Sequence, residues 1–153
     1  MNSLINFDIV SPEKFIMPSD IIEEQCAIIK EKSDNMVIAK IFEISDSRIF
    51  DGLYQNDFQD ESHFIYEFIV TSVFTPNYKF RIFYMRNGID GYPVEIILDP
   101  GIAEDISMSQ SGSCDNETVF VELLKSVLNS NKMQRVVKSL YARSMKVNDS
   151  LPF

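Results

Sequence analysis

The chain has 153 residues, of which 45% are hydrophobic, and a formal net charge of −9 with an isoelectric point near 4.5. This length predicts a single domain spanning residues 1–153, large enough to bury a core without disulfide bonds. The negative charge argues against nonspecific binding to nucleic acid or to anionic membranes, because both need a basic surface. Two explanations of the charge stay open: solubility, or an acidic surface that meets a basic partner.

The sequence contains no apolar run of about 18 residues, which a membrane span needs. Its N-terminus, MNSLINFDIVSPEK, has neither a basic region nor a long apolar core, so we expect no signal peptide and a cytoplasmic protein. Cys26 falls in a helical pattern among isoleucines and is expected to be a buried small hydrophobe. Cys114 stands at a helix start, where a lowered thiol pKa is a weak alternative.

Residues 1–18 are expected to form an irregular arm, with one short strand around Leu4 to Val10 as an option. A first helix is predicted from Ser19 or Asp20 to about residue 31. Asp20 and Glu23 resemble a capping box, and Ser33-Asp34-Asn35 is a stop signal. The β-branched run at 36–44 predicts a strand. The acidic segment 45–63 is expected to be an exposed loop pinned to the body by its large apolar side chains.

Residues 64–98 alternate with period two and predict a three-stranded antiparallel meander. A turn at Thr75-Pro76-Asn77 would pair Val70 with Ile82 and Phe68 with Tyr84. The even positions would then form an aromatic core face. The odd face mixes apolar and charged side chains, and it is either covered by a helix or an interface; its candidate residues are Ile69, Phe83, Ile97, Arg81 and Glu95.

Residues 99–117 hold five acids and no base, and SMSQSGSC within them is the segment most prone to disorder. Two helices are predicted after it, at about 115–128 and 132–145, separated by Asn129-Ser130-Asn131, and residues 147–153 are expected to be a tail. Residues 130–146 hold five bases and no acid, which either balance the preceding acidic segment or form a basic stripe. We consider nucleic-acid docking on this stripe disfavoured by the global charge.

No catalytic, cofactor-binding or metal-binding residue is predicted. His63 is the one histidine, so a multi-histidine metal site is excluded and a catalytic triad is disfavoured. Asp57, Asp60 and Glu61 do not have the spacing of a calcium-binding loop. The five glycines are scattered in turns and form no phosphate-binding loop. We therefore expect a protein that is not an enzyme and has no cofactor.

Three stretches, MPSDIIEEQCAIIKEKSDNMVIAKI, TPNYKFRIFYMRNGIDGYPVEI and ETVFVELLKSVLNSNKMQRVVKSLYARS, resemble a family of small bacterial proteins of unknown function. The resemblance covers much of the chain. Its landmarks fall on Gln25, Pro76, Tyr78, Tyr92, Pro93, Val94 and Leu140. A histidine expected before the Tyr-Pro-Val strand is absent here, where Arg86 and Asn87 stand instead. The resemblance implies a bacterial origin and no activity.

The order of elements predicts an α+β domain with one antiparallel sheet of four or five strands. The N-terminal helix and the C-terminal helical pair are expected to pack on its aromatic face. The leading hypothesis for function is an interaction protein, of an accessory or immunity type, that binds a protein partner or a second copy of itself through an acidic or mixed apolar surface. One alternative is a small-ligand binder or enzyme with a pocket between sheet and helices lined by Tyr66, Phe68, Tyr84 and Tyr141. Another is an acidic mimic of nucleic acid.

Overall fold

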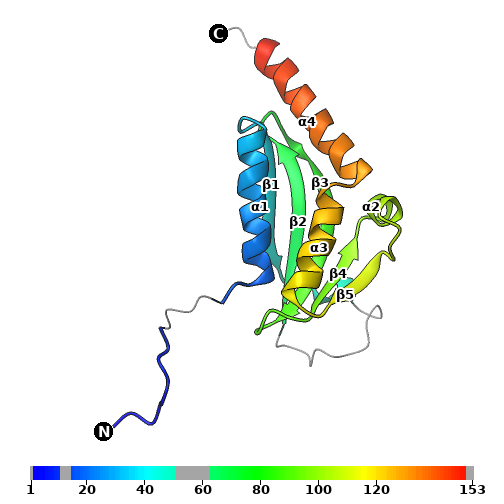
Figure 1. Ribbon diagram of the computed structural model, residues 1–153. Helices are drawn as coiled ribbons and strands as arrows, with labels where there is room; N and C mark the ends of the chain where they lie inside the picture. The colour runs from blue at the N-terminus through cyan, green and yellow to red at the C-terminus, as the bar shows by residue number, and fades with distance from the viewer. Residues whose placement is uncertain (1, 11–14, 51–62, 151–153) are drawn as a thin grey trace.

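The computed structural model describes residues 2–10, 15–50 and 63–150, and its elements are shown in Figure 1. Five strands form one sheet in the order β1-β2-β3-β4-β5, and every neighbouring pair is antiparallel. The strands are β1 (Val37–Ile44), β2 (His63–Ser72), β3 (Thr75–Gly88), β4 (Val94–Leu98) and β5 (Ser111–Cys114). The helices are α1 (Pro18–Lys32), α2 (Pro100–Asp105), α3 (Glu117–Leu128) and α4 (Asn131–Ser150), with a short 3-10 helix η1 (Ser47–Phe50).

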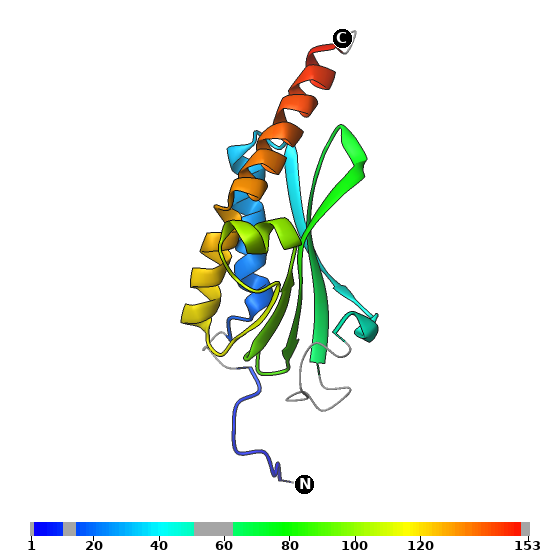
Figure 2. The same cartoon turned by 90° about the vertical axis from the view of Figure 1, so that its right-hand side faces the viewer.

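The helices α1, α3 and α4 cover one face of the sheet, here called the inner face, and η1 lies on the opposite, outer face (Figure 2). The predicted α+β class, the antiparallel sheet and the packing of N-terminal and C-terminal helices on it are confirmed. None of the helices in the described ranges has the length and apolar character that a membrane span requires.

The first helix begins at Pro18 with Met17 as its N-cap, so the predicted start at Ser19 or Asp20 and the capping box of Asp20 with Glu23 are wrong, whereas its end lies where local signals predict. Pro18 occupies the first turn, and the Asp20 carboxylate accepts a hydrogen bond of 2.9 Å from the Met17 N–H, so Asp20 caps from inside the helix. At the other end Asp34 and Asn35 take positive φ angles of 51° and 64°. Short polar side chains tolerate this left-handed conformation better than others do. The predicted stop at Ser33-Asp34-Asn35 is confirmed, and β1 follows at Val37.

The predicted register of the β2–β3 hairpin is wrong. Its turn is at residues 73–74, because Ser72 pairs with Thr75, so Thr75-Pro76-Asn77 lies inside β3. Val70 pairs with Phe80, whereas Phe68 pairs with Phe83. One more residue stands between the partners on β3 than on β2, which is a β-bulge at Ile82. The bulge exchanges the faces of the residues that follow it, so Phe83 and Met85 point inward while Tyr84 and Arg86 point outward.

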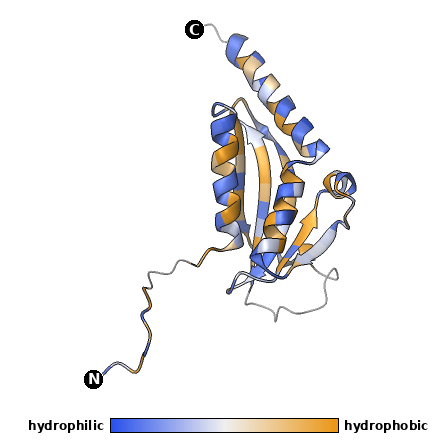
Figure 3. Cartoon of the chain, viewed as in Figure 1, coloured by the Kyte–Doolittle hydropathy of each residue, from blue (hydrophilic) through white to orange (hydrophobic). Residues whose placement is uncertain are grey.

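The core lies between the inner face and the helices. Phe68 and Phe83 meet edge to face with ring centroids 5.1 Å apart, a favoured aromatic geometry. Ile22 from α1, Phe120 from α3 and Met133 from α4 are all buried against this sheet. Figure 3 shows apolar residues alternating with polar ones along the helices, and apolar residues along the strands behind them. Each helix is therefore held by its own apolar stripe.

Three further expectations differ from the structure. SMSQSGSC does not stay irregular, because residues 111–114 form β5 at the edge of β4. The helix predicted to end at 145 continues to Ser150, so most of the expected tail is helical. Residues 2–10 are irregular, as the leading prediction has it, and the optional strand around Leu4 to Val10 does not form; Leu4, Phe7 and Ile9 are exposed. The loop expected at 45–63 contains η1, and its residues 51–62 lie outside the described part.

Candidate functional site

The five residues of the predicted interface do not share one face. Ile69 pairs with Arg81 and Glu95 pairs with Arg86, all on the outer face, and Ile97 lies there as well. Phe83 belongs to the inner face and is buried in the core, so its assignment to the interface is wrong. Ile69 is only 7% exposed, and only Arg81 of the set is classed as exposed. These residues therefore offer little apolar surface to a partner.

A buried ion pair occupies the centre of the outer face. The Arg86 guanidinium donates to the Glu95 carboxylate, with its Nε 3.0 Å from Oε2. The same guanidinium lies 4.8 Å from the centre of the Phe50 ring, and Phe50 of η1 is 1% exposed. The short helix η1 thus covers this part of the face. Of the two alternatives predicted for this face, cover by a helix or an interface, the first therefore holds for the part around Arg86.

The four residues of the predicted ligand pocket lie on two faces. Tyr66 and Phe68 point inward, and Tyr141 of α4 packs against the core. Tyr84 points outward, where its hydroxyl accepts a hydrogen bond of 2.8 Å from Arg81. Partial burial raises the pKa of both Tyr66 and Tyr84 above the ordinary tyrosine value. Because the sheet separates Tyr84 from the other three, the four cannot line one pocket.

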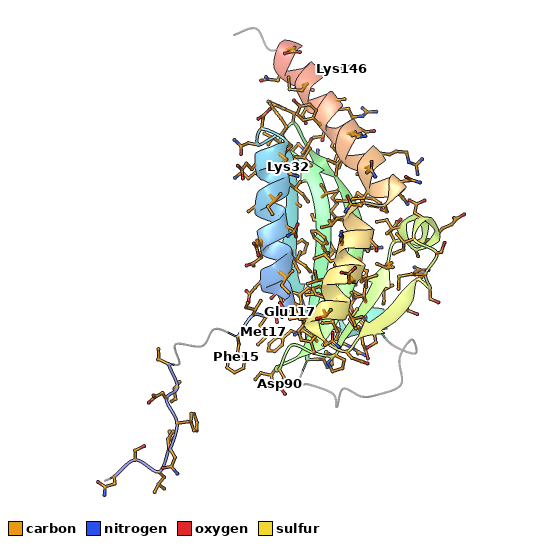
Figure 4. All side chains as sticks on the ribbon, viewed as in Figure 1. Phe15, Met17, Lys32, Asp90, Glu117 and Lys146 are labelled. Carbon is orange, nitrogen blue, oxygen red and sulfur yellow. The ribbon has the colours of Figure 1, made fainter. Side chains whose placement is uncertain are left out.

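A groove of about 500 Å³ opens instead in the helical layer, between α1 on one side and α3 and α4 on the other; we call it the helical groove. Figure 4 shows Met17 and Glu117 at the same end of this layer, so α1 and α3 run in the same direction. The groove walls are aliphatic, from Ile21, Ile28, Ile29, Val121, Leu124, Leu128, Met133 and Val137. Its polar side chains are Gln25, Lys32, Lys125, Asn129, Gln134 and Lys138.

The helical groove follows from where each helix rests. α1 packs on β1, whereas α4 lies mainly against β2 and β3, and the axis of α4 is inclined to that of α1 (Figure 1). Buried positions such as Ile22 and Phe120 complete the core below, and neighbouring positions such as Ile21 and Val121 face the groove. Val121 is 41% exposed there, so part of its apolar side chain is accessible in the groove.

A second groove, of about 600 Å³, lies on the other side of α4, where this helix faces the first residues of β3; we call it the basic groove. It is lined by Thr75, Tyr78, Lys132, Arg135, Val136, Ser139, Leu140 and Arg143. The Lys132 ammonium forms an ion pair of 2.7 Å with Asp99 and lies 5.2 Å from the centre of the Phe80 ring. The predicted balance between the acidic segment and the basic helix is seen in this pair.

Two acids of the 99–117 segment have structural roles. The Asp99 carboxylate accepts hydrogen bonds from the N–H groups of Gly101 and Ile102, at 3.0 and 3.1 Å, and so caps α2. The Asp105 carboxylate accepts a hydrogen bond of 2.7 Å from the Lys132 N–H at the start of α4. These contacts connect α2 to α4. They remove two carboxylates from any acidic surface that a partner could meet.

Neither thiol has the environment of a nucleophile. Burial raises the pKa of Cys26 and of Cys114 to about 11 each. The weak alternative of an activated Cys114 is therefore wrong, because burial outweighs its place before α3. Among the described residues no three histidine, cysteine or carboxylate side chains come together as metal ligands. Asp57, Asp60 and Glu61 lie outside the described residues.

The chain matches no protein family model, no curated protein and no solved structure. The resemblance to a bacterial family stays a prediction.

Sequence reasoning missed both grooves. Ile28 and Ile29 lie in the predicted first helix and Arg135 lies in the predicted basic stripe, but neither prediction includes a groove. The sequence does contain a signal for the helical groove, which is the width of the apolar stripe on the helix predicted at about 115–128. There Val119 and Val121 add to Phe120 and Leu124. Both valines are exposed, so the stripe is wider than the sheet below can bury.

Proposed function

We propose that this protein is a binding module without catalytic activity, which takes up an apolar segment of a protein partner in the helical groove. One observation carries the proposal: aliphatic side chains from three helices line an open groove of about 500 Å³. Open apolar surface of this kind is costly unless it serves recognition. Amphipathic helices bind to such grooves through side chains spaced three or four residues apart.

The polar side chains of the groove add a preference for charge. Lys32, Lys125 and Lys138 contribute three ammonium groups to a protein whose net charge is −9. A partner helix with acidic residues beside its apolar stripe would gain from them, and one with basic residues would not. This reverses the expectation of an acidic binding surface, while the proposal of an accessory or immunity-type interaction protein is kept.

The proposal is tested by selecting binders from a displayed library of amphipathic helical peptides. The substitution Val121→Glu places a charge in the groove, and we expect it to weaken the selected peptides at least tenfold, or about 1.4 kcal/mol. The matched control is Phe42→Glu on β1, because Phe42 is 39% exposed and Val121 is 41% exposed. Equal affinity for the wild type and the Val121→Glu variant would contradict the proposal.

A small apolar ligand is the second candidate function. The groove volume of about 500 Å³ is within the range of ligand sites, which runs from roughly 300 to 1,000 Å³. Isothermal titration with a medium-chain fatty acid tests it. The predicted heat of binding is present for the wild type and absent for Val121→Glu, and no heat for the wild type would contradict it.

A further inference from the structure

We propose that the basic groove binds a short, extended acidic peptide, which adds to the free edge of β3 and places its carboxylates against Arg135 and Arg143. The two sides of α4 serve different surfaces: Val137 and Lys138 line the helical groove, whereas Arg135 and Arg143 line the basic groove. The inference is therefore independent of the function proposed above.

The first observation is uncompensated positive charge. Lys132 is paired with Asp99, but Arg135 and Arg143 form no ion pair with any residue of the described ranges. Both are exposed on a helix stretch that holds five bases and no acid between residues 130 and 146. In a protein with a net charge of −9, such a local concentration of guanidinium groups favours a small anionic ligand.

The second observation is the spacing of these groups. Arg135, Ser139 and Arg143 follow one another at intervals of four residues, so they lie along one side of α4. Eight helical residues rise by about 12 Å. In an extended peptide, residues four apart are about 13 Å apart and point to the same side. Carboxylates at every second position of a strand would therefore reach both arginines.

The third observation is an unpaired strand edge beside the groove. β3 begins at Thr75, but β4 pairs only with its residues from Phe83 to Asn87. The Ile82 carbonyl accepts a hydrogen bond of 3.0 Å from the Asp99 N–H, which ends the covered part of the edge. From Thr75 to Arg81, no strand in the described chain pairs with the side of β3 that faces away from β2. Extended peptides bind such edges through backbone hydrogen bonds.

The apolar residues of the basic groove favour aliphatic side chains on the other side of the peptide. Val136, which is half-buried, and Leu140, which is 3% exposed, also line the groove and make its floor apolar. A strand that alternates acidic and aliphatic residues fits both features, because its side chains point alternately to opposite sides. A long polyanion such as duplex DNA fits less well, because the rest of the protein would repel it.

The test uses a fluorescein-labelled octapeptide of alternating glutamate and valine, followed by fluorescence anisotropy with the full chain at low salt. We expect Arg135→Glu with Arg143→Glu to weaken binding at least tenfold. The control is Lys30→Glu with Lys40→Glu, which gives the same net charge on exposed residues that do not line the groove, and it should change affinity less than twofold. If the charge-reversal pair fails to fold, the neutral pair Arg135→Gln with Arg143→Gln takes its place. We expect the neutral pair to weaken binding by less than the charge reversal but by more than the control.

Two peptides that are N-methylated at all odd or at all even positions test the strand addition. One of them should lose binding, because one alternate set of N–H groups would face β3. The inference is overturned if both methylated peptides bind like the parent, or if the wild type fails to bind the parent. It is also overturned if the control pair weakens binding as much as the arginine pair, or if duplex DNA binds more tightly than the peptide. Val121→Glu should leave this affinity unchanged, so failure here and failure of the helical groove are distinguishable.

Discussion

Glu95 and Arg86 hold opposite charges in a nearly dry environment, with side chains 5% and 10% exposed. The substitution Glu95→Gln keeps the shape of the side chain and removes one counter-charge from the buried guanidinium. Breaking a buried pair in this way costs about 3 kcal/mol, because a buried charge loses its partner. Urea unfolding, followed by circular dichroism, measures the change in the free energy of unfolding.

The pair between Lys79 and Glu67 is the matched control on the same face. The Lys79 side chain is 62% exposed, and its Nζ lies 3.6 Å from the carboxylate. Lys79→Ala should cost less than about 1 kcal/mol, because water screens the pair. Equal costs for the two substitutions would mean that burial does not set the strength of the Arg86 pair.

The two thiols give the protein a pH dependence in the alkaline range. The pKa of each cysteine rises from 9.0 to about 11 in the folded state, so the unfolded state releases these protons first. Stability is therefore fully present below pH 9 and falls as the pH rises from 9 through about 11. We expect Cys26→Ala with Cys114→Ala to flatten this decline, as measured by urea unfolding at a series of pH values. An unchanged slope would show that the thiols do not cause it.

At the scale of elements, α2 depends on Asp99 in two ways, as its N-cap and as the partner of Lys132. Asp99→Ala removes both contacts and should cost about 2 kcal/mol. Asp99→Asn keeps an N-cap oxygen and removes the charge, so its cost should be about half as large. Thermal unfolding of both variants separates the two roles. The same loss for both would show that the ion pair dominates.

The helices α1, α3 and α4 were predictable because each is bounded by a local signal, such as Ser33 after α1 and Asn129 after α3, whereas α2 and η1 were not predicted. The register of β2 and β3 was not, because the turn at residues 73–74 has no glycine or asparagine to mark it. The bulge at Ile82 then moved Phe83 from the predicted interface into the core. β5 has no alternating pattern, and its backbone pairing with β4 determines its structure.

At the scale of the whole molecule, α4 separates two surfaces of different chemistry. One side faces an aliphatic groove and the other a basic groove. Helix periodicity predicts which residues turn toward the sheet, but the distance between α1 and α3 depends on how each rests on the sheet. The shapes of the grooves were therefore not predictable from the sequence, although most of their lining residues lie in helices that were predicted, and Thr75 and Tyr78 of the basic groove lie on β3.

The central claim is that the helical groove holds a protein segment, and site-specific photo-crosslinking in the native host tests it most directly. A benzoylphenylalanine in place of Gln25 lies in the groove, and one in place of Phe42 lies on β1 outside it. We predict one dominant adduct from position 25, lost when Val121→Glu is added to the same chain, and none from position 42. No adduct from position 25, or one that survives Val121→Glu, would contradict the claim.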